Sequence, residues 1–295
     1  MTALYIIGNG FDRHHGMATD YRKFGDYLRK TDRELSGFLD EYLPVYEDDF
    51  WWHFEAHLAS FDADTLIENS EQFIVPYSAD DWSDAFHHDY AYELERVVGA
   101  LSEGLLKAFS AWIKRVAIPS PASLTAPKAR IDPSARFINF NYTETLQRLY
   151  SVPDPQIWHI HGTAAGDGKL ILGHGWRPKA AETYSSRLDP ERDDTRVLDG
   201  AEIIDRYFKS TFKPTEKIIA ENAGRFAAIA DVDDIRVLGH SLSDVDLPYL
   251  RTIAASVGRG AQWRISFHGD PASVQEQFGK FADPKDATFL PLASV

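Results

Sequence analysis

Short apolar runs that stop at polar or glycine-rich residues recur along this chain. Four of them are Ile6–Asp12, Phe137–Thr143, Trp158–Gly162 and Val237–Leu242. Each has the pattern of a buried strand, because the strands of a parallel sheet are near-continuous apolar runs. Open α/β sheets bind their ligands where such strands end. We therefore expect the four strand ends to meet in one composite pocket.

The same pattern predicts a sheet whose strands are spread over the whole chain. The expected strands cover residues 4–7, 136–140, 157–161, 169–172, 235–238, 262–267 and 287–291. Apolar residues at helical spacing predict helices from about residue 20 and over 143–150, 201–208, 215–230 and 247–257. Alternating strands and helices are typical of a doubly wound, mostly parallel α/β sheet of the Rossmann-like type.

A long helical segment separates the first strand from the rest of the sheet. Residues 35–119 have mainly helical periodicity, and 119–133 are rich in Pro, Ser and Ala, as linkers are. We expect a helical insertion or cap at 35–130. A Rossmann-like nucleotide-binding domain would comprise 1–34 and 131–295. The charged stretch 175–199 is expected to form a mobile loop over the pocket.

Composition limits the class of protein. The chain has 295 residues, 44% hydrophobic and 26% charged, as in ordinary globular proteins. It has no cysteine, which excludes disulfides, thiolate nucleophiles and cysteine-based zinc sites. No apolar stretch approaches the ~20 residues that span a bilayer. The first residues carry no basic leader, so we expect a cytoplasmic protein without membrane association.

The net charge of −14 bears on partners. Loose binding along nucleic acid depends on Lys and Arg that neutralise phosphates. A nucleic-acid partner is therefore not expected, although a local basic groove around Arg177, Lys179, Arg187 and Arg206 is an alternative to ordinary solvated arginines.

The first strand leads into Gly8-Asn9-Gly10. Two glycines around a short polar residue let the backbone approach phosphates, and the following amides point at them. The ordinary dinucleotide fingerprint is not met, because Arg13 stands where its third glycine would be and Gly16 follows later. A tight turn without a ligand is the alternative.

Two residues at strand ends are candidates for catalysis. His159 and His161 alternate along a strand and point to opposite faces, so a two-histidine metal site is not expected and no metal is predicted. His161 lies at the strand end and is the better general base. The carboxamide of Asn141 can orient a water or a sugar hydroxyl, or it can satisfy local backbone groups.

Residues 239–246 end one strand and begin a helix. Ser241 or Ser243 can donate to a phosphate, and Asp246 can accept from ribose hydroxyls. Alternatively, Asp244 or Asp246 only caps the following helix.

Taken together, these segments resemble the bacteriophage abortive-infection AbiH family. The resemblance runs from Leu4 to about Leu250 and rests on six pieces. They are Ile6–Asp12, Thr19–Tyr21, Trp52–Glu55, Asn139–Thr143, Ile160–Gly162 and Gly239–Asp246.

The order of these motifs also resembles, more distantly, the sirtuin-type NAD-binding fold. Gly8, Gly10 and Gly16 keep the spacing of the sirtuin Gly-Ala-Gly-x-Ser turn and its later glycine. The sirtuin segments Asp-Phe-Arg, Gln-Asn-Ile-Asp, His-Gly and Gly-Thr-Ser-Leu are similar, in this order, to Asp20–Arg22, the segment of Asn141, His161–Gly162 and Gly239–Leu242.

Three departures from sirtuins shape what the resemblance implies. Asp12 replaces a serine near the phosphates, and Thr143 stands where sirtuins place an Asp that holds the nicotinamide amide. The cysteines of the sirtuin zinc ribbon are absent. The resemblance therefore implies hydrolysis of NAD or a related nucleotide, and not protein deacylation.

The resemblance also implies roles for individual residues. His161 would be the general base, and Asn141 would position the attacking water or the ribose. The nucleotide would contact Gly8, Asn9, Gly10, Phe11, Asp12, Gly16, Tyr21, Arg22, Tyr142, Thr143, Gly162, Gly239, His240, Ser241 and Asp246.

The expected function is that of an antiphage abortive-infection effector that binds and hydrolyses NAD or a related nucleotide. One alternative is a nucleotide-sensing binding protein without turnover that engages a protein partner or forms a homo-oligomer. The other is an RNA-directed nuclease toxin, which the net charge and the lack of carboxylates at metal-binding spacing disfavour.

Overall fold

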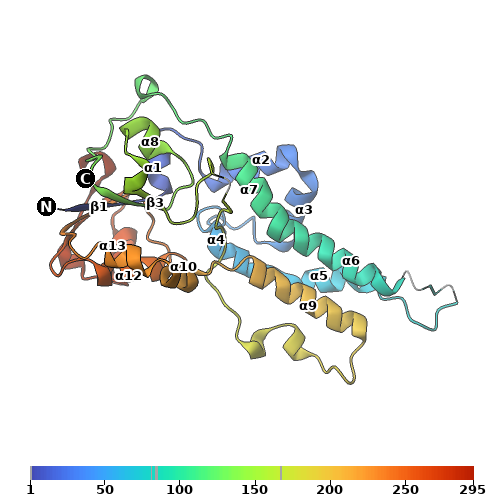
Figure 1. The fold of residues 1–295 in the computed structure, drawn as a ribbon. Helices are drawn as coiled ribbons and strands as arrows, with labels where there is room; N and C mark the ends of the chain where they lie inside the picture. Colours follow the sequence, from blue (N-terminus) through green and yellow to red (C-terminus); the bar gives the residue numbers. More distant parts are fainter. Residues whose placement is uncertain (1, 81, 84–85, 167) are drawn as a thin grey trace. The chain divides into compact units, whose positions relative to one another are not determined.

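The computed structural model describes residues 2–80, 82–83, 86–166 and 168–295 (Figure 1). The chain forms two compact units. The first unit, called the sheet unit here, comprises Met1–Lys23, Ser110–Ile171 and Pro214–Val295. The second, the helical unit, comprises Phe24–Phe109 and Leu172–Lys213. Residues 1, 81, 84, 85 and 167 of the predicted domains lie outside the described residues.

The sheet unit contains a six-stranded sheet in the order β3-β2-β1-β4-β5-β6, and all neighbouring strands are parallel. The strands are β1 (Ala3–Ile7), β2 (Arg136–Asn139), β3 (Ile157–His159), β4 (Asp234–Leu238), β5 (Gln262–Phe267) and β6 (Ala287–Pro291). This is the strand order of dinucleotide-binding folds, in which the order reverses between β1 and β4. The prediction of a doubly wound, parallel Rossmann-like sheet is confirmed.

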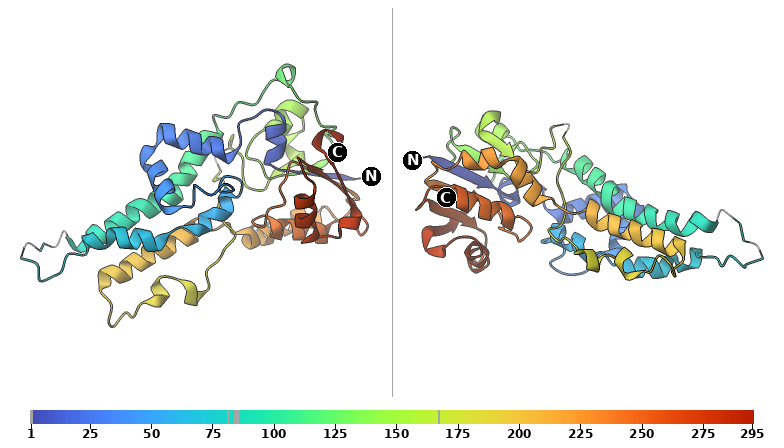
Figure 2. Two further views of the ribbon diagram at one scale, coloured as in Figure 1. Left: turned by 180° about the vertical axis from the view of Figure 1, so that it is seen from behind. Right: turned by 60° about the horizontal axis from the view of Figure 1, so that its bottom comes forward.

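Helices cover both faces of this sheet. Leu4 and Ile6 of β1 face α10 (Thr215–Glu221), α11 (Ala223–Ala227), α12 (Leu247–Ser256) and α13 (Ala272–Gly279). Tyr5 and Ile7 face the opposite way, toward α1 (Asn9–His14) and α8 (Thr145–Tyr150). Figure 2 shows the green α8 and the orange α12 on opposite sides of the strands. Alternating side chains of each strand are therefore buried on both faces, which explains the near-continuous apolar runs.

Some predicted elements of the sheet unit are wrong in detail. Residues 169–172 are not a strand. Lys169 is exposed, and the segment belongs to the loop after β3. There the Ile171 N–H donates to the His161 carbonyl at 3.0 Å. The strand predicted at 157–161 ends at His159, since the chain turns at Gly162, whose φ is +84°. The helix predicted at 215–230 is divided into α10 and α11 at Asn222.

The helical unit differs from the predicted insertion at 35–130, because it takes in residues 172–213. The reason is the long helix α9 (Thr195–Ser210), which begins inside the predicted loop 175–199 and packs on α6 (Phe86–Gly99). Gly200 allows this close approach, since a Cβ there would lie 2.4 Å from the Tyr90 ring and 2.9 Å from Leu94. The helix–helix contact places residues 195–210 with residues 86–99.

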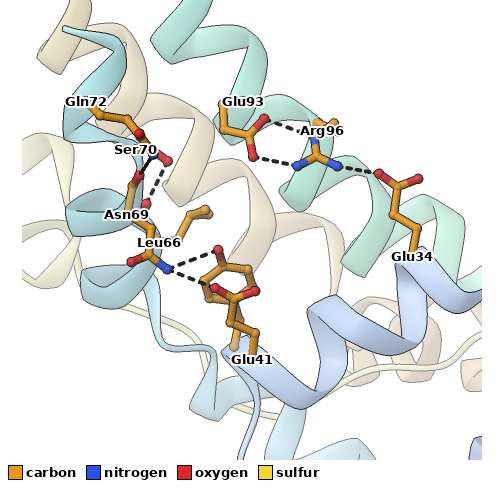
Figure 3. A network of polar contacts seen from close by, with 9 residues as sticks. Glu34, Glu41, Leu66, Asn69, Ser70, Gln72, Glu93 and Arg96 are labelled. Carbon is orange, nitrogen blue, oxygen red and sulfur yellow. Dashed lines mark hydrogen bonds and ion pairs between the residues drawn. The ribbon is translucent and has the colours of Figure 1, made fainter.

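Further helices complete this unit and its connections to the sheet unit. They are α2 (Tyr21–Thr31), α3 (Arg33–Tyr42), α4 (Phe54–His57), α5 (Ala63–Ser70) and α7 (Leu105–Ile113). Figure 3 shows their polar contacts: the guanidinium of Arg96 contacts Glu93 on its own helix and Glu34 on α3, and Asn69 donates to Glu41. Exposed ion pairs of this kind contribute about 0–1 kcal/mol each, so the buried apolar side chains supply most of the stability. None of the described helices is long and apolar enough to cross a membrane.

Candidate functional site

All the predicted site residues belong to the sheet unit. They follow the carboxyl ends of β1, β2, β3 and β4, where ligands bind in open α/β sheets. Many of their polar side chains form two clusters. The Asp12 cluster consists of Asp12, Asn141, Thr143 and Thr145, and the Asp246 cluster consists of His161, His240 and Asp246.

The glycines after β1 are required by a neighbouring turn. A Cβ on Gly8 would lie 2.5 Å from the Cα of His240, and one on Gly10 would lie 2.8 Å from the carbonyl oxygen of Gly239. Gly239 itself has φ +66°, and a Cβ there would lie 2.0 Å from the amide nitrogen of Phe11. The turns after β1 and β4 therefore pack backbone against backbone, which only glycine permits.

Hydrogen bonds within the protein occupy several amides of this turn. The N–H groups of Gly8 and Gly10 donate to the carbonyls of Leu238 and Gly239 at 3.0 and 2.7 Å, and that of Phe11 donates to Gly8 at 2.9 Å. The Asn9 side chain donates to the Thr19 carbonyl at 2.8 Å. The turn thus joins β1 to β4 through backbone hydrogen bonds, and the binding of a phosphate there stays a prediction.

Asp12 is a buried carboxyl group, only 1% exposed. The Thr143 hydroxyl donates to its Oδ2 at 2.6 Å, while Oδ1 receives no hydrogen bond from any described residue. Burial raises the pKa of Asp12 to about 6, and the Thr143, Thr145 and Asn141 side chains, which favour the carboxylate, offset this only in part. Buried and partly satisfied acids with raised pKa values are common at functional sites.

Asn141 links the ends of two strands. Its Nδ2 donates to the carbonyl of Gly8 at 3.0 Å, and its backbone N–H donates to the side-chain Oδ1 of Asn139 at 3.0 Å. His159, the last residue of the neighbouring strand β3, donates from Nδ1 to the Asn141 carbonyl at 3.0 Å. The local structural contact that the sequence left open for Asn141 is therefore present.

The Asp246 cluster is a carboxylate between two imidazoles. His161 Nε2 lies 3.7 Å from Oδ1 of Asp246, and His240 Nε2 lies 3.6 Å from Oδ2. The Phe140 ring stands edge-on to both histidines, with centroid distances of 5.2 and 4.4 Å. The contacts combine residues from the loop after β3 with residues from the segment between β4 and α12.

The tautomer of His240 is set by the backbone. The N–H of Leu242 donates to His240 Nδ1 at 2.9 Å, so Nδ1 carries no proton in the neutral ring. The proton of neutral His240 is therefore on Nε2, the atom that faces Asp246. Leu242 adopts φ +57°, an uncommon value for a residue with a side chain, which keeps this turn tight.

The other predicted site residues differ in their burial and in their hydrogen bonds. The Tyr142 hydroxyl donates to the Ile171 carbonyl at 2.7 Å. Gly16 has φ +76° in open space, and Arg22 and Ser241 are exposed. Thr145 was missed by sequence reasoning, although its place two residues after Thr143 is a signal that could have identified it.

The helical unit carries features that sequence reasoning missed. Two hollows of about 390 and 500 Å³ lie in it, and neither is lined by a predicted site residue. Among the described residues, a group able to hold a metal ion is formed by Glu47, Asp49 and His57, whose ligand atoms lie within 4.8 Å of one another. Two of these three residues are exposed carboxylates.

Comparisons with known proteins address the identity of the chain. No curated protein and no solved structure matches it. The family model described as "Bacteriophage abortive infection AbiH" matches residues 4–267. This range includes both polar clusters and the strands from β1 to β5, apart from the first residue of β1. The chain therefore belongs to the bacteriophage abortive infection AbiH family.

Proposed function

We propose that this AbiH-family chain is an abortive-infection effector that binds and hydrolyses NAD or a related nucleotide in the cytoplasm. The observation that supports this most is the position of the two polar clusters. They lie at the carboxyl ends of β1, β2 and β4, where the strand order reverses. Dinucleotides bind at this point of Rossmann-like sheets.

The chemistry of NAD cleavage suits the groups at this site. The bond between ribose C1′ and the nicotinamide nitrogen breaks with its electron pair going to the cationic ring, which leaves as a neutral base. Only the attacking water must lose a proton. In this proposal the pair of His161 and Asp246 accepts that proton. Asn141 positions the attacking water or the ribose in this proposal, and Ser241, which is exposed, donates to the ribose or phosphates.

Loss of NAD from the cell would also account for abortive infection, the role that the family description gives. A cell deprived of its hydride carrier stops growing, and a phage inside it cannot replicate. Hydrolysis of a nucleotide is therefore a sufficient chemical basis for abortive infection.

The test is the release of nicotinamide from NAD by the purified chain. We expect His161→Ala to lower the rate by ~100-fold or more, the usual contribution of a general base. Asn141→Ala should lower it by about tenfold, since the variant loses the bond to Gly8 that holds the site together. His88→Ala, a histidine exposed in the helical unit, is the matched control and should keep full activity.

Absence of nicotinamide release by the unaltered chain would refute hydrolysis of NAD. Calorimetric binding of NAD without product would then favour the alternative of a nucleotide sensor. Loss of added RNA that depends on a divalent metal would instead favour the nuclease alternative.

A further inference from the structure

Asp246 differs from its two imidazole neighbours in its access to solvent. Its side chain is 13% exposed, whereas those of His161 and His240 are each 3% exposed. His161 Nε2 is itself buried. We infer that Asp246 is the catalytic residue of this cluster that touches the substrate, and that His240 is the residue that positions it. This inference rests on the proposed function.

Access decides which group meets the attacking water. A ligand that approaches the end of β4 from solvent reaches the carboxylate before either ring. The His161 side chain is more deeply buried than that of Asp246, and its Nε2 lies 3.7 Å from Oδ1. A proton taken from water is therefore received by Asp246 and passed on to His161.

The surroundings of His240 fix its role. The Leu242 N–H donates to His240 Nδ1 at 2.9 Å, so the ring carries its proton on Nε2. This nitrogen lies 3.6 Å from Oδ2 of Asp246. The Ser243 hydroxyl adds a second donor to Oδ2 at 3.4 Å. Donors that face a carboxylate favour its charged form and restrict its rotation. His240 thus holds Asp246 in one orientation with its charge available.

The same tautomer argues against a metal triad of His161, His240 and Asp246. To ligate a metal through Nε2, neutral His240 would have to carry its proton on Nδ1. That proton would point at the Leu242 N–H, and two donors would face each other at 2.9 Å. The tautomer of His240 therefore suits a contact with Asp246 and not the ligation of a metal.

The reaction balances without a further reactant. The water oxygen forms a bond to ribose C1′, and the bond from C1′ to the nicotinamide nitrogen breaks with its electrons going to the ring. One water proton passes to Asp246, is shared with His161, and leaves to solvent through Asp246, the more exposed of the two groups. The products are ADP-ribose, nicotinamide and one proton. The substrate class is a nucleotide whose leaving base is cationic.

Three variants test this assignment. Asp246→Asn keeps the shape of the side chain but removes its charge, and we expect kcat for NAD to fall by ~100-fold or more. His240→Asn keeps an acceptor for the Leu242 N–H but lacks a donor toward Asp246, so kcat should fall by about tenfold with KM changed little. His240→Gln places an amide N–H near the position of Nε2 and should recover activity to within about threefold of the unaltered chain.

A spectroscopic measurement follows the cluster independently of turnover. In ¹⁵N-histidine NMR spectra, His240 should show the tautomer protonated at Nε2. Adding NAD to the unaltered chain should shift the signals of His161 and His240, and Asp246→Asn should abolish that shift. Circular dichroism verifies that each variant is folded. If Asp246→Asn does not fold, the comparison of His240→Asn with His240→Gln decides, and equal activities would overturn the assignment.

The outcomes separate this inference from the proposed function. Hydrolysis that Asp246→Asn leaves unchanged would overturn the inference and support the function. Shifts on adding NAD that depend on Asp246, without any product, would support contact between Asp246 and the nucleotide while refuting hydrolysis. Neither product nor shift would overturn both.

Discussion

At the scale of single residues, the buried carboxyl of Asp12 has the clearest energetic consequence. Its pKa is raised to about 6 by burial, above the ordinary value of 3.8. The folded protein therefore binds this proton more tightly than the unfolded chain, and stability falls as pH rises from about 4 to about 6. Above that range the charged group costs roughly 3 kcal/mol. The chain retains a destabilising acid beside its candidate site.

Asp12→Asn should remove this penalty. We expect the variant to be more stable than the unaltered chain by about 1–3 kcal/mol at pH 7.5, and nearly equal to it at pH 4. Urea denaturation at the two pH values measures the difference. Asp286→Asn, an exposed acid in the same unit, is the control and should show no such pH dependence. An equal gain at both pH values would show that charge is not the cause.

At the scale of elements, the turns after β1 and β4 pack tightly on each other beside the pairing of these two strands. Each turn supplies glycines that the other requires, as the 2.0 Å approach of a Gly239 Cβ to the Phe11 nitrogen shows. This contact crosses the point where the strand order reverses. The same backbone packing sets the position of His240 directly after Gly239, and so couples the site to the sheet.

Gly239→Ala should therefore destabilise the sheet unit by more than ~3 kcal/mol or prevent folding, because it combines a backbone clash with a positive φ. Gly224→Ala in α11, where a Cβ would meet nothing within 4 Å, is the matched control. That change should be neutral or stabilise the chain by up to ~1 kcal/mol. Thermal unfolding of both variants provides the comparison, and similar midpoints would contradict the role given to Gly239.

At the scale of the whole molecule, the two units should respond to acid in opposite directions. The helical unit buries His174 completely, and desolvation lowers the pKa of this histidine from 6.5 to about 4. A folded-state pKa below the unfolded one means that stability is lost as pH falls from about 6.5 to about 4. Asp12 has the opposite effect on the sheet unit over part of the same range.

His174→Gln tests this difference between the units. The variant keeps a polar atom for the Thr211 hydroxyl, which lies 3.1 Å from His174 Nε2, but it cannot titrate. We expect amide hydrogen exchange in the helical unit to accelerate between pH 6.5 and 4 in the unaltered chain, after correction for intrinsic rates, by the equivalent of about 3 kcal/mol. The variant should lack this change. The same pH profile in both proteins would exclude His174 as its cause.

The local pattern of apolar and polar residues was sufficient to predict most strands of the sheet. It was not sufficient to predict how the chain divides into two units. The strands at 3–7, 234–238 and 262–267 are nearly as predicted, because burial on both faces leaves a continuous apolar run. Residues 195–199 were predicted as loop and are helix, since the Asp194 side chain caps α9 and Gly200 lets it pack on Tyr90. That contact joins residues far apart in sequence and has no local signature.

By itself, the sequence determined most of the strands, the Rossmann-like class, the AbiH family and the polar residue types at the strand ends. The strands depend on neighbours within a few positions along the chain, and the class and the family follow from the order of such local segments. The tertiary structure alone decided that Gly8 and Gly10 pack on Gly239, and that Asp246 lies between His161 and His240. Such contacts depend on which strands become adjacent, and the burial of both sheet faces by the whole chain sets that order.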